Sequence, residues 1–449
     1  MRTPAFFAAS IGTAALVFIV ASLIGNDYLF FAGYTVVQFV VLASAWNILG
    51  GYCGYVNFGT AAFFALGAYT SVFFHKTFPL PIPVLLAIAA LVSGLVGLGT
   101  GYLTLRLRGA FFSIATLALA VVLQTFVVNW DYVGGSRGAY VIRPNSVGVF
   151  GFELDYVRYL CLIMLLLAAV AVAIARTIER SKLGYGFATI RDDELAAEAS
   201  GVPTLKLKLI ATTLSGALMG MAGAPFPYYI GYVEPASTFG LPYAVNSIAM
   251  PLIGGTTIWF GPLIGSILLG VLTQLATVTI SSAVNLLLVG ALLVGFVIVA
   301  PNGLVGLVQQ FLRIASPGRP DVRSTGLVAV AGFGFIVGLF DVVFNLAALL
   351  ASDVSGEAIA TAGLVLAALW LVSSYGLMTI RRGSPLLATV AFGLSILLAV
   401  VHIWIDRSLG NVALWGVGVA VAIGAIWFLQ RRHVQELYQP RLGQPEVAA

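Results

Sequence analysis

The segment from Glu179 to Lys208 concentrates ionisable side chains in a chain that has few of them elsewhere. The 449 residues are 60% hydrophobic and 9% charged, yet this segment reads ERSKLGYGFATIRDDELAAEASGVPTLKLK. Side chains of these types can serve acid–base catalysis, metal binding or docking to another chain. The segment contains neither His nor Cys, which are the usual ligands of a zinc or transition-metal site. Docking is therefore the chemistry that these residues favour.

A short helix over residues 190–202 is expected to present these charges. Asp192, Asp193 and Glu194 would lie in its first turn, where negative charge complements the helix dipole, and Gly201 would end it. The pattern gives one apolar side and one acidic side. The apolar side would comprise Ile190, Leu195, Ala199 and Val202, and the acidic side Glu194 and Glu198.

Two interpretations of this helix compete. It is either a solvated loop without a role or a docking element for a soluble partner. Loops between elements are usually short unless something keeps them long. A compact charged insertion therefore favours docking.

The rest of the chain predicts an all-α, polytopic membrane protein. Apolar stretches repeatedly reach the roughly 20 residues that cross a bilayer as a helix, and backbone polar groups in lipid require helices rather than open sheet. We expect a core of about ten spans and about four additional C-terminal spans. The expected spans are 5–24, 29–49, 53–74, 83–104, 110–129, 156–175, 208–230, 238–256, 260–281 and 285–300, then 326–350, 358–379, 385–404 and 412–429.

Basic residues predict the orientation of these spans. Lys and Arg collect in cytoplasmic loops, and an even number of expected spans separates neighbouring basic clusters, so every cluster can lie on one side. Both termini and the charged segment would be cytoplasmic, and the loop 130–155 would be the longest external connection. The net charge of +5 then reflects contact with anionic lipid and cytoplasm, and no nucleic-acid partner is expected.

The apolar pattern also suggests where domains begin and end. Residues 1–310 would form the transmembrane domain, with the charged loop at 180–205, and Pro, Gly and Arg interrupt the pattern at 311–324 as a cytoplasmic linker. An appended bundle would follow at 325–435, before a disordered tail at 436–449.

The role of the appended bundle is left open between assembly or stability and a fused second function. Within it, Asp341 would either reach a wet or protein-lined pocket or lie near the outer end of its span.

Two glycine-rich stretches are candidates for the translocation path. LGGYCGYVNFGTAAFFALG and IGGTTIWFGPLIGSILLG share a GG, FG, LG order, which is consistent with a faint internal repeat and with irregular backbone that lines a cavity. Helix packing by small residues is the alternative. The candidate residues are Gly50, Gly51, Tyr52, Asn57, Phe58, Gly59, Gly254, Gly255, Thr256 and Trp259.

Several motifs, in order along residues ~30 to 310, resemble those of ABC importer permeases. The resemblance is to the M-type (LivM-like) permeases of branched-chain amino acid and urea uptake systems. Besides YGFATIRDDELAAEASGV, the motifs are LASAWNILGGYCGYVNFGTAAFFALGAYTS, LRLRGAFFSIATLALAVVLQTFVVNWDYVGG, PLIGGTTIWFGPLIGSILLG and VIVAPNGLVGL.

This resemblance implies a pore shared with a second, H-type permease in a prokaryotic inner membrane. Two ABC ATPase subunits would bind ATP and Mg below, and an extracytoplasmic binding protein would deliver the solute; this chain itself would carry no cofactor, metal or catalytic site. One departure is GFAT at 186–189, where relatives carry a basic residue or two. The ATPase-coupling residues would be Arg191, Asp192, Asp193, Glu194, Glu198, Ala199 and Gly201.

The chain has no GxxxxGK[ST] phosphate-binding loop, so any ATP must be bound by another chain. The first ten expected spans show no ionisable residue well inside, which disfavours proton coupling. A sodium-coupled carrier built on broken helices remains the alternative. A membrane enzyme and a passive channel are disfavoured. The uncharged, aromatic path suits leucine, isoleucine and valine, although urea, amides and aromatic acids would also fit.

Overall fold

The structure is a computed structural model. It describes residues 3–24, 26–105, 107, 109–149, 152–279, 303–306, 338, 354–378, 384–405, 423, 426–427 and 429–430. The chain divides into two compact units. The first comprises Met1–Val271 and Leu292–Val305, and the second comprises Leu272–Ala291 and Gly306–Ala449, which includes the helices Val354–Met378 and Ser384–Ile405.

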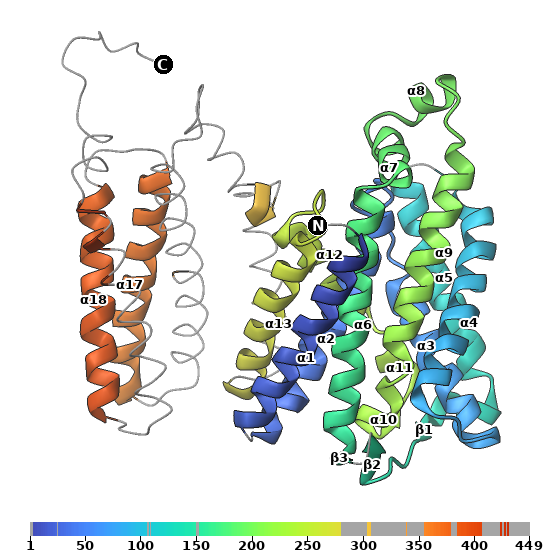
Figure 1. Cartoon of the computed structure of the whole chain (residues 1–449), viewed down its shortest axis with the longest axis horizontal. Helices are drawn as coiled ribbons and strands as arrows, with labels where there is room; N and C mark the ends of the chain where they lie inside the picture. Colours follow the sequence, from blue (N-terminus) through green and yellow to red (C-terminus); the bar gives the residue numbers. More distant parts are fainter. Residues whose placement is uncertain are drawn as a thin grey trace. The chain divides into compact units, whose positions relative to one another are not determined.

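Long apolar helices build the first unit (Figure 1). Six helices in the described part of the chain are long and apolar enough to cross a membrane. The multi-pass character predicted from composition is therefore confirmed. The described helices of this unit are α1 (Thr3–Ile24), α2 (Asp27–Leu49), α3 (Thr60–Thr77), α4 (Ile82–Thr104), α5 (Ala110–Val128), α6 (Tyr156–Glu179), α7 (Lys182–Asp192), α8 (Glu194–Ala199), α9 (Thr204–Gly223), α10 (Phe226–Ile230), α11 (Pro235–Thr238), α12 (Leu241–Gly254) and the part of α13 (Gly261–Thr279) that ends at Val271.

Three expected spans are shorter or interrupted. The span expected at 53–74 begins only at Thr60, because the chain from 51 to 59 is non-helical and Gly54 has φ +80°. The span expected at 208–230 is divided into α9 and α10, and the one at 238–256 is reduced to α12, with the short helix α11 just before it. Pro225 and Pro235 stand at or next to the starts of these new helices, where a missing backbone N–H is harmless.

Helix α9 occupies the interior of this unit and packs against α2, α3 and α4. Glycines allow the close approach. A Cβ added at Gly67 of α3 would collide with the Gly220 backbone of α9, and one at Gly223 would collide with the Phe64 backbone. Small residues at such crossings let helix backbones touch, which is how helices associate in lipid.

In the described part of the chain, short strands occur in the connections between helices, and the all-α fold class is consistent with the structure. Strand β1 (Ala139–Tyr140) pairs with β4 (Tyr232–Val233), and β2 (Ser146–Val149) pairs with β3 (Phe152–Asp155), all antiparallel. The 3₁₀ turns η1 (Asp131–Val133) and η2 (Gly135–Arg137) precede them. The connection predicted at 130–155 thus has its own secondary structure.

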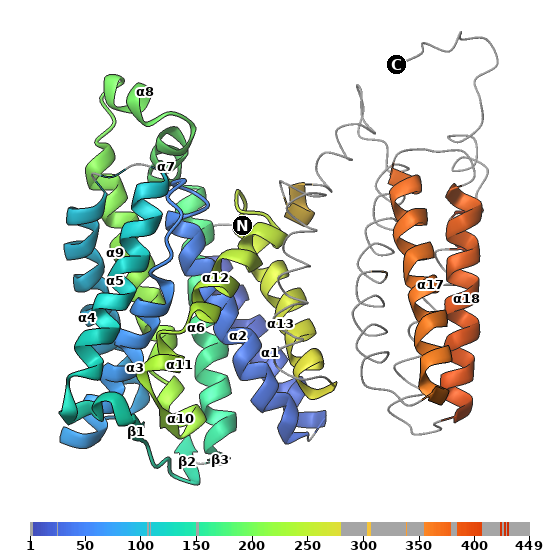
Figure 2. The ribbon, with the colours of Figure 1, turned by 180° about the vertical axis from the view of Figure 1, so that it is seen from behind.

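The two ends of the first unit differ. Figures 1 and 2 show the β2–β3 hairpin at one end of the helices and α8 at the other. Asp155, the last residue of β3, caps α6 by accepting a hydrogen bond from the Val157 amide at 3.0 Å. The chain therefore enters the bundle at a defined point from the hairpin end.

The second unit contains α17 (Val354–Met378) and α18 (Ser384–Ile405), which pack side by side and are drawn in orange in Figure 1. Trp370 meets Phe392 edge to face at 4.4 Å, and its indole N–H donates to the Ser395 hydroxyl at 3.0 Å. The predicted linker at 311–324, the tail at 436–449 and Asp341 lie outside the described residues.

Candidate functional site

The charged segment forms two helices, not one. Helix α7 ends at Asp192 and α8 begins at Glu194, with Asp193 between them in an extended conformation (φ −159°, ψ 107°). The carboxylate of Asp193 accepts the Ala196 amide at 3.1 Å. The single helix expected over 190–202 is therefore wrong. The reason is that an Asp can cap a new helix as readily as it can occupy the first turn of an existing one.

The break at Asp193 also divides the predicted apolar side. Ile190 is buried at 3% exposure, whereas Leu195 is 62% exposed, and Ala199 also faces outward. Ala197, which was not predicted, is the buried residue of α8. The exposed leucine and the small exposed residues beside it give α8 an apolar outer surface.

Most of the predicted coupling residues are exposed along α7, α8 and the turn that follows α8. Arg191 and Asp192 form an exposed ion pair at 3.2 Å. Gly201 ends the loop with φ +81°, a conformation that favours glycine, as expected from the sequence. The exposed members of the set are Arg191, Asp192, Asp193, Glu198, Ala199 and Gly201.

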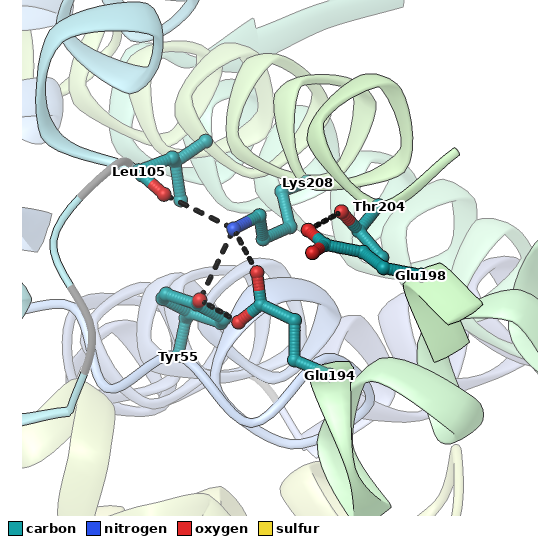
Figure 3. Close-up of polar contacts among 6 residues, drawn as sticks. All are labelled: Tyr55, Leu105, Glu194, Glu198, Thr204 and Lys208. Atoms are coloured by element: carbon teal, nitrogen blue, oxygen red, sulfur yellow. Dashed lines mark hydrogen bonds and ion pairs between the residues drawn. The ribbon is translucent and has the colours of Figure 1, made fainter. Parts of the chain in front are cut away.

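Glu194 is different because it points inward to Lys208 of α9 (Figure 3). The Lys208 ammonium donates to Glu194 Oε1 at 2.7 Å, to Tyr55 Oη at 3.1 Å and to the Leu105 carbonyl at 3.0 Å. Tyr55 in turn donates its hydroxyl hydrogen to Glu194 Oε2. The three donors of an ammonium thus have three acceptors, so the buried charge is both paired and solvated by protein.

Glu198 contributes to the same region without entering this cluster. Its Oε1 accepts the Thr204 hydroxyl at 2.7 Å, which ties the end of α8 to the start of α9 (Figure 3). Glu194 and Glu198 therefore do not form one uniform acidic side. One carboxylate faces the bundle interior, and the other secures the loop while remaining exposed at its surface.

The charged segment rests against the first glycine-rich stretch. A Cβ added at Gly54 would lie 2.9 Å from Arg191 Cγ. A groove of about 450 Å³ opens beside this contact, lined by Gly54, Tyr55, Val56, Gly109, Ala110, Ser113 and Glu194. The segment expected to meet a partner and the segment expected to line the path are thus in direct contact.

The two glycine-rich stretches also meet each other. A Cβ added at Gly51 would lie 2.5 Å from the Thr256 carbonyl oxygen. Gly254 approaches the Gly261 backbone so closely that a side chain could not fit. These glycines allow close backbone packing, and this packing brings the two stretches together.

A carboxylate holds the second stretch in place. Glu179 Oε2, at the end of α6, accepts the Trp259 amide at 2.6 Å. The Trp259 ring itself meets Phe6 of α1 edge to face at 5.1 Å. The break between α12 and α13 is consequently anchored to two other helices.

The remaining candidates in the first stretch are held by polar contacts. The Asn57 carbonyl accepts the Trp46 indole N–H at 2.8 Å, and its side chain accepts the Gly59 amide at 2.7 Å. The Phe58 amide donates to the Thr116 hydroxyl at 3.0 Å. Gly50 packs on Trp46, and Tyr52 is buried. The non-helical stretch is thus a defined structure rather than a loose loop.

Sequence analysis missed Lys208, Tyr55, Leu105 and Glu179 as site residues. One signal was available for Lys208: it is a charged residue in the first turns of an apolar helix, and such residues are usually paired. Within the described ranges, no group of three or more His, Cys, Asp and Glu side chains is placed to hold a metal ion.

The cap at Asp193 gives a first testable prediction. Asp193→Ala removes the acceptor of the Ala196 amide, and loss of such a cap costs about 1 kcal/mol. We expect the amides of α8 to exchange with solvent about fivefold faster, measured by hydrogen–deuterium exchange. Asp193→Asn keeps an oxygen acceptor and is the matched control. Equal exchange in both variants would contradict the assignment of the cap.

Comparison with known proteins shows which family and which relatives the chain matches. The family model of the branched-chain amino acid transport system permease component matches residues 28–297. No solved structure matches the chain.

Individual relatives agree with the family model. The chain is 28% identical to the high-affinity branched-chain amino acid transport system permease protein LivM of Salmonella typhimurium over 300 residues, which cover 62% of this chain and 70% of the relative. It is also 28% identical to LivM of Escherichia coli over 298 residues, covering 62% and 69%. A probable LivH of Methanocaldococcus jannaschii is 25% identical over 275 residues, covering 57% and 85%.

Proposed function

The chain belongs to the branched-chain amino acid transport permease family, and from this premise we propose that it is the M-type permease subunit of an ATP-driven importer. Its solutes would be small neutral amino acids, with leucine, isoleucine and valine preferred. The observation that carries the proposal is the α7–α8 segment, which exposes charged and apolar residues at one end of the bundle and packs against the first glycine-rich stretch. An ATPase subunit bound to α8 would therefore act directly on the first glycine-rich stretch.

Membership in this family makes the chain a non-enzymatic part of a multi-subunit transport system. The proposed partners are an H-type permease, two ABC ATPase subunits that bind ATP and Mg, and an extracytoplasmic binding protein. The ATPases would contact the outer surface of α7 and α8, namely Arg191, Asp192, Asp193, Glu198, Ala199 and Gly201, while Glu194 would act from inside.

The proposed location is the prokaryotic inner membrane, with both termini and α8 on the cytoplasmic side. The binding protein would then dock at the other end of the first unit, where the β2–β3 hairpin lies (Figure 2). A cysteine introduced at Ala199 should accordingly resist a membrane-impermeant thiol reagent in intact cells. The native thiols Cys53 and Cys161 are buried and should not obscure the readout.

The proposed solute class follows from the character of the path candidates. Tyr52, Asn57, Phe58, Thr256 and Trp259 are uncharged, and such a lining suits a solute without net charge and with an apolar side chain. An ionic solute would need compensating charges along the way.

Uptake into membrane vesicles that contain the partner chains tests the proposal. Accumulation of leucine should require ATP and the binding protein and should persist when sodium is replaced by choline. Uptake that is insensitive to ATP depletion and lost without sodium would refute ATP-driven transport. Uptake of urea in place of leucine would refute the solute assignment alone.

Docking itself can be tested separately from transport. Ala199→Arg places a bulky cation on the outer surface of α8 and should weaken ATPase binding about tenfold, equivalent to about 1.4 kcal/mol. Glu153→Arg changes the exposed residue Glu153 of β3, at the other end of the first unit, and is the control. Pull-down titration of purified complexes measures both. Equal binding by the two variants would place the docking surface elsewhere.

A further inference from the structure

Four separate parts of the chain converge on the Lys208 ammonium (Figure 3). Lys208 belongs to α9, Glu194 to α8 and Leu105 to the end of α4. Tyr55 comes from the first glycine-rich stretch, 153 residues from Lys208 in sequence. A single buried charge thus connects the outward-facing helix α8 with the segment that lies against the second stretch.

Burial makes this connection stiff. The side chains of Lys208 and Glu194 are only 4% and 13% exposed. Separating them would leave a charge in a poorly hydrated environment, which is strongly unfavourable. Displacing helix α8 without also moving the groups that bind Glu194 would therefore have a large free-energy cost.

Tyr55 continues the connection toward the path candidates. Its hydroxyl joins both Glu194 and Lys208, its ring meets Phe112 edge to face at 5.1 Å, and its amide donates to the Leu49 carbonyl at 3.1 Å. Leu49 is the last residue of α2, and Gly51, which lies against Thr256, is two residues further along the chain. Displacement of Tyr55 would thus be transmitted to the contact between the two glycine-rich stretches.

We propose that Glu194, Tyr55 and Lys208 are positioning residues that transmit the movement of α8 to the stretch 50–59. This inference rests on the proposed function, because it assumes that an ATPase moves α8. In this proposal the cluster transmits movement and binds neither the ATPase nor the solute. Its role is to keep the docking helix and the path lining moving as one body, so that hydrolysis is converted into translocation.

The proposal predicts uncoupling rather than loss of docking. Tyr55→Phe removes only the hydroxyl and keeps the ring contact with Phe112; Glu194→Gln removes the charge and keeps the size. In reconstituted complexes, both variants should bind the ATPases as the wild type does and still hydrolyse ATP. The amount of leucine transported per ATP should fall by at least about fivefold, the lower range of typical coupling between sites.

Tyr229→Phe is the matched control. Tyr229 and Tyr55 are equally buried, both at 7% exposure, and the Tyr229 hydroxyl donates to the Phe31 carbonyl away from Lys208. Its leucine-to-ATP ratio should be unchanged. A parallel fall of binding, hydrolysis and uptake in Tyr55→Phe, or an unchanged ratio, would overturn the positioning role.

These outcomes separate the two proposals. Failure of the wild-type complex to show ATP-dependent uptake refutes the proposed function. A wild type that couples uptake to ATP, together with a Tyr55→Phe variant that couples equally well, refutes only the role of the cluster. Detergent-solubilised yield and thermal stability, measured for both variants, identify misfolding. Because the Gln amide oxygen can still accept a hydrogen bond from the Lys208 ammonium, Glu194→Gln provides the second independent measurement if Tyr55→Phe misfolds.

Discussion

Replacement of Lys208 by Met is expected to lower the free energy of unfolding by about 3–5 kcal/mol, the usual cost of removing one partner from a buried ion pair. Met fills nearly the same space but donates no hydrogen bond. Glu194, Tyr55 Oη and the Leu105 carbonyl would each lose the ammonium that they share. Denaturant or thermal unfolding of the purified protein in detergent measures the change.

Lys206 provides the control on the same helix. It lies two positions earlier in α9 and is exposed, so Lys206→Met should change stability by less than about 0.5 kcal/mol. Combining Lys208→Met with Glu194→Leu removes both charges and should recover part of the loss. Similar unfolding midpoints for Lys206→Met and Lys208→Met would show that the buried pair is not what stabilises this region.

The second large effect is expected at Gly67. An added Cβ would collide with the backbone of Gly220, which cannot rotate away as a flexible side chain could. Gly67→Ala should force α3 and α9 apart and cost about 1–3 kcal/mol, as overpacked sites do. The unfolding midpoint in detergent and the yield of folded protein should both fall.

Gly99 of α4 provides the control for Gly67→Ala. No atom lies within 4 Å of a Cβ built there. Gly99→Ala should therefore leave stability unchanged or raise it by up to about 1 kcal/mol, because Ala favours helix more than Gly does. The same chemical change thus has opposite expected signs at two sites. A loss of equal size at Gly99 would mean that helix packing does not explain the glycines.

The spans with uninterrupted apolar runs could be predicted closely from the sequence. The expected spans 83–104 and 110–129 correspond to α4 (Ile82–Thr104) and α5 (Ala110–Val128). In such runs, length and hydropathy alone decide that a helix forms. Prediction failed where glycine and proline allow the backbone to leave the helix, as before Thr60 and around Pro225, because hydropathy does not detect a break.

The charged segment could be predicted as a helical insertion, but its internal geometry could not. Asp193 is compatible with a first-turn position and with a cap, and only packing of Ala197 against the bundle distinguishes the two. Likewise, nothing near Glu194 in sequence indicates that its carboxylate turns inward. That orientation depends on Lys208, in the next long helix, and on Tyr55, whose distant position leaves no local pattern.

The family resemblance identified in the sequence is confirmed by the family model and by LivM relatives. The contacts between the predicted segments could not be predicted from the motifs. The motifs located both glycine-rich stretches and the charged segment, whereas the contacts that join them, such as Gly51 with Thr256, depend on side chains and backbone brought together by folding.

The uneven burial of the long helices has an evolutionary consequence. Only 6% of the most apolar window of α1 is buried within the chain, compared with 67% for α2. An outward face requires little beyond hydrophobicity, while an interior face must also match the shapes of its neighbours. In a deep mutational library, exchanges among apolar residues should therefore be tolerated in α1 and selected against in α2. Sequence variation among descendants of this protein should accordingly concentrate in the helices at the periphery of the fold.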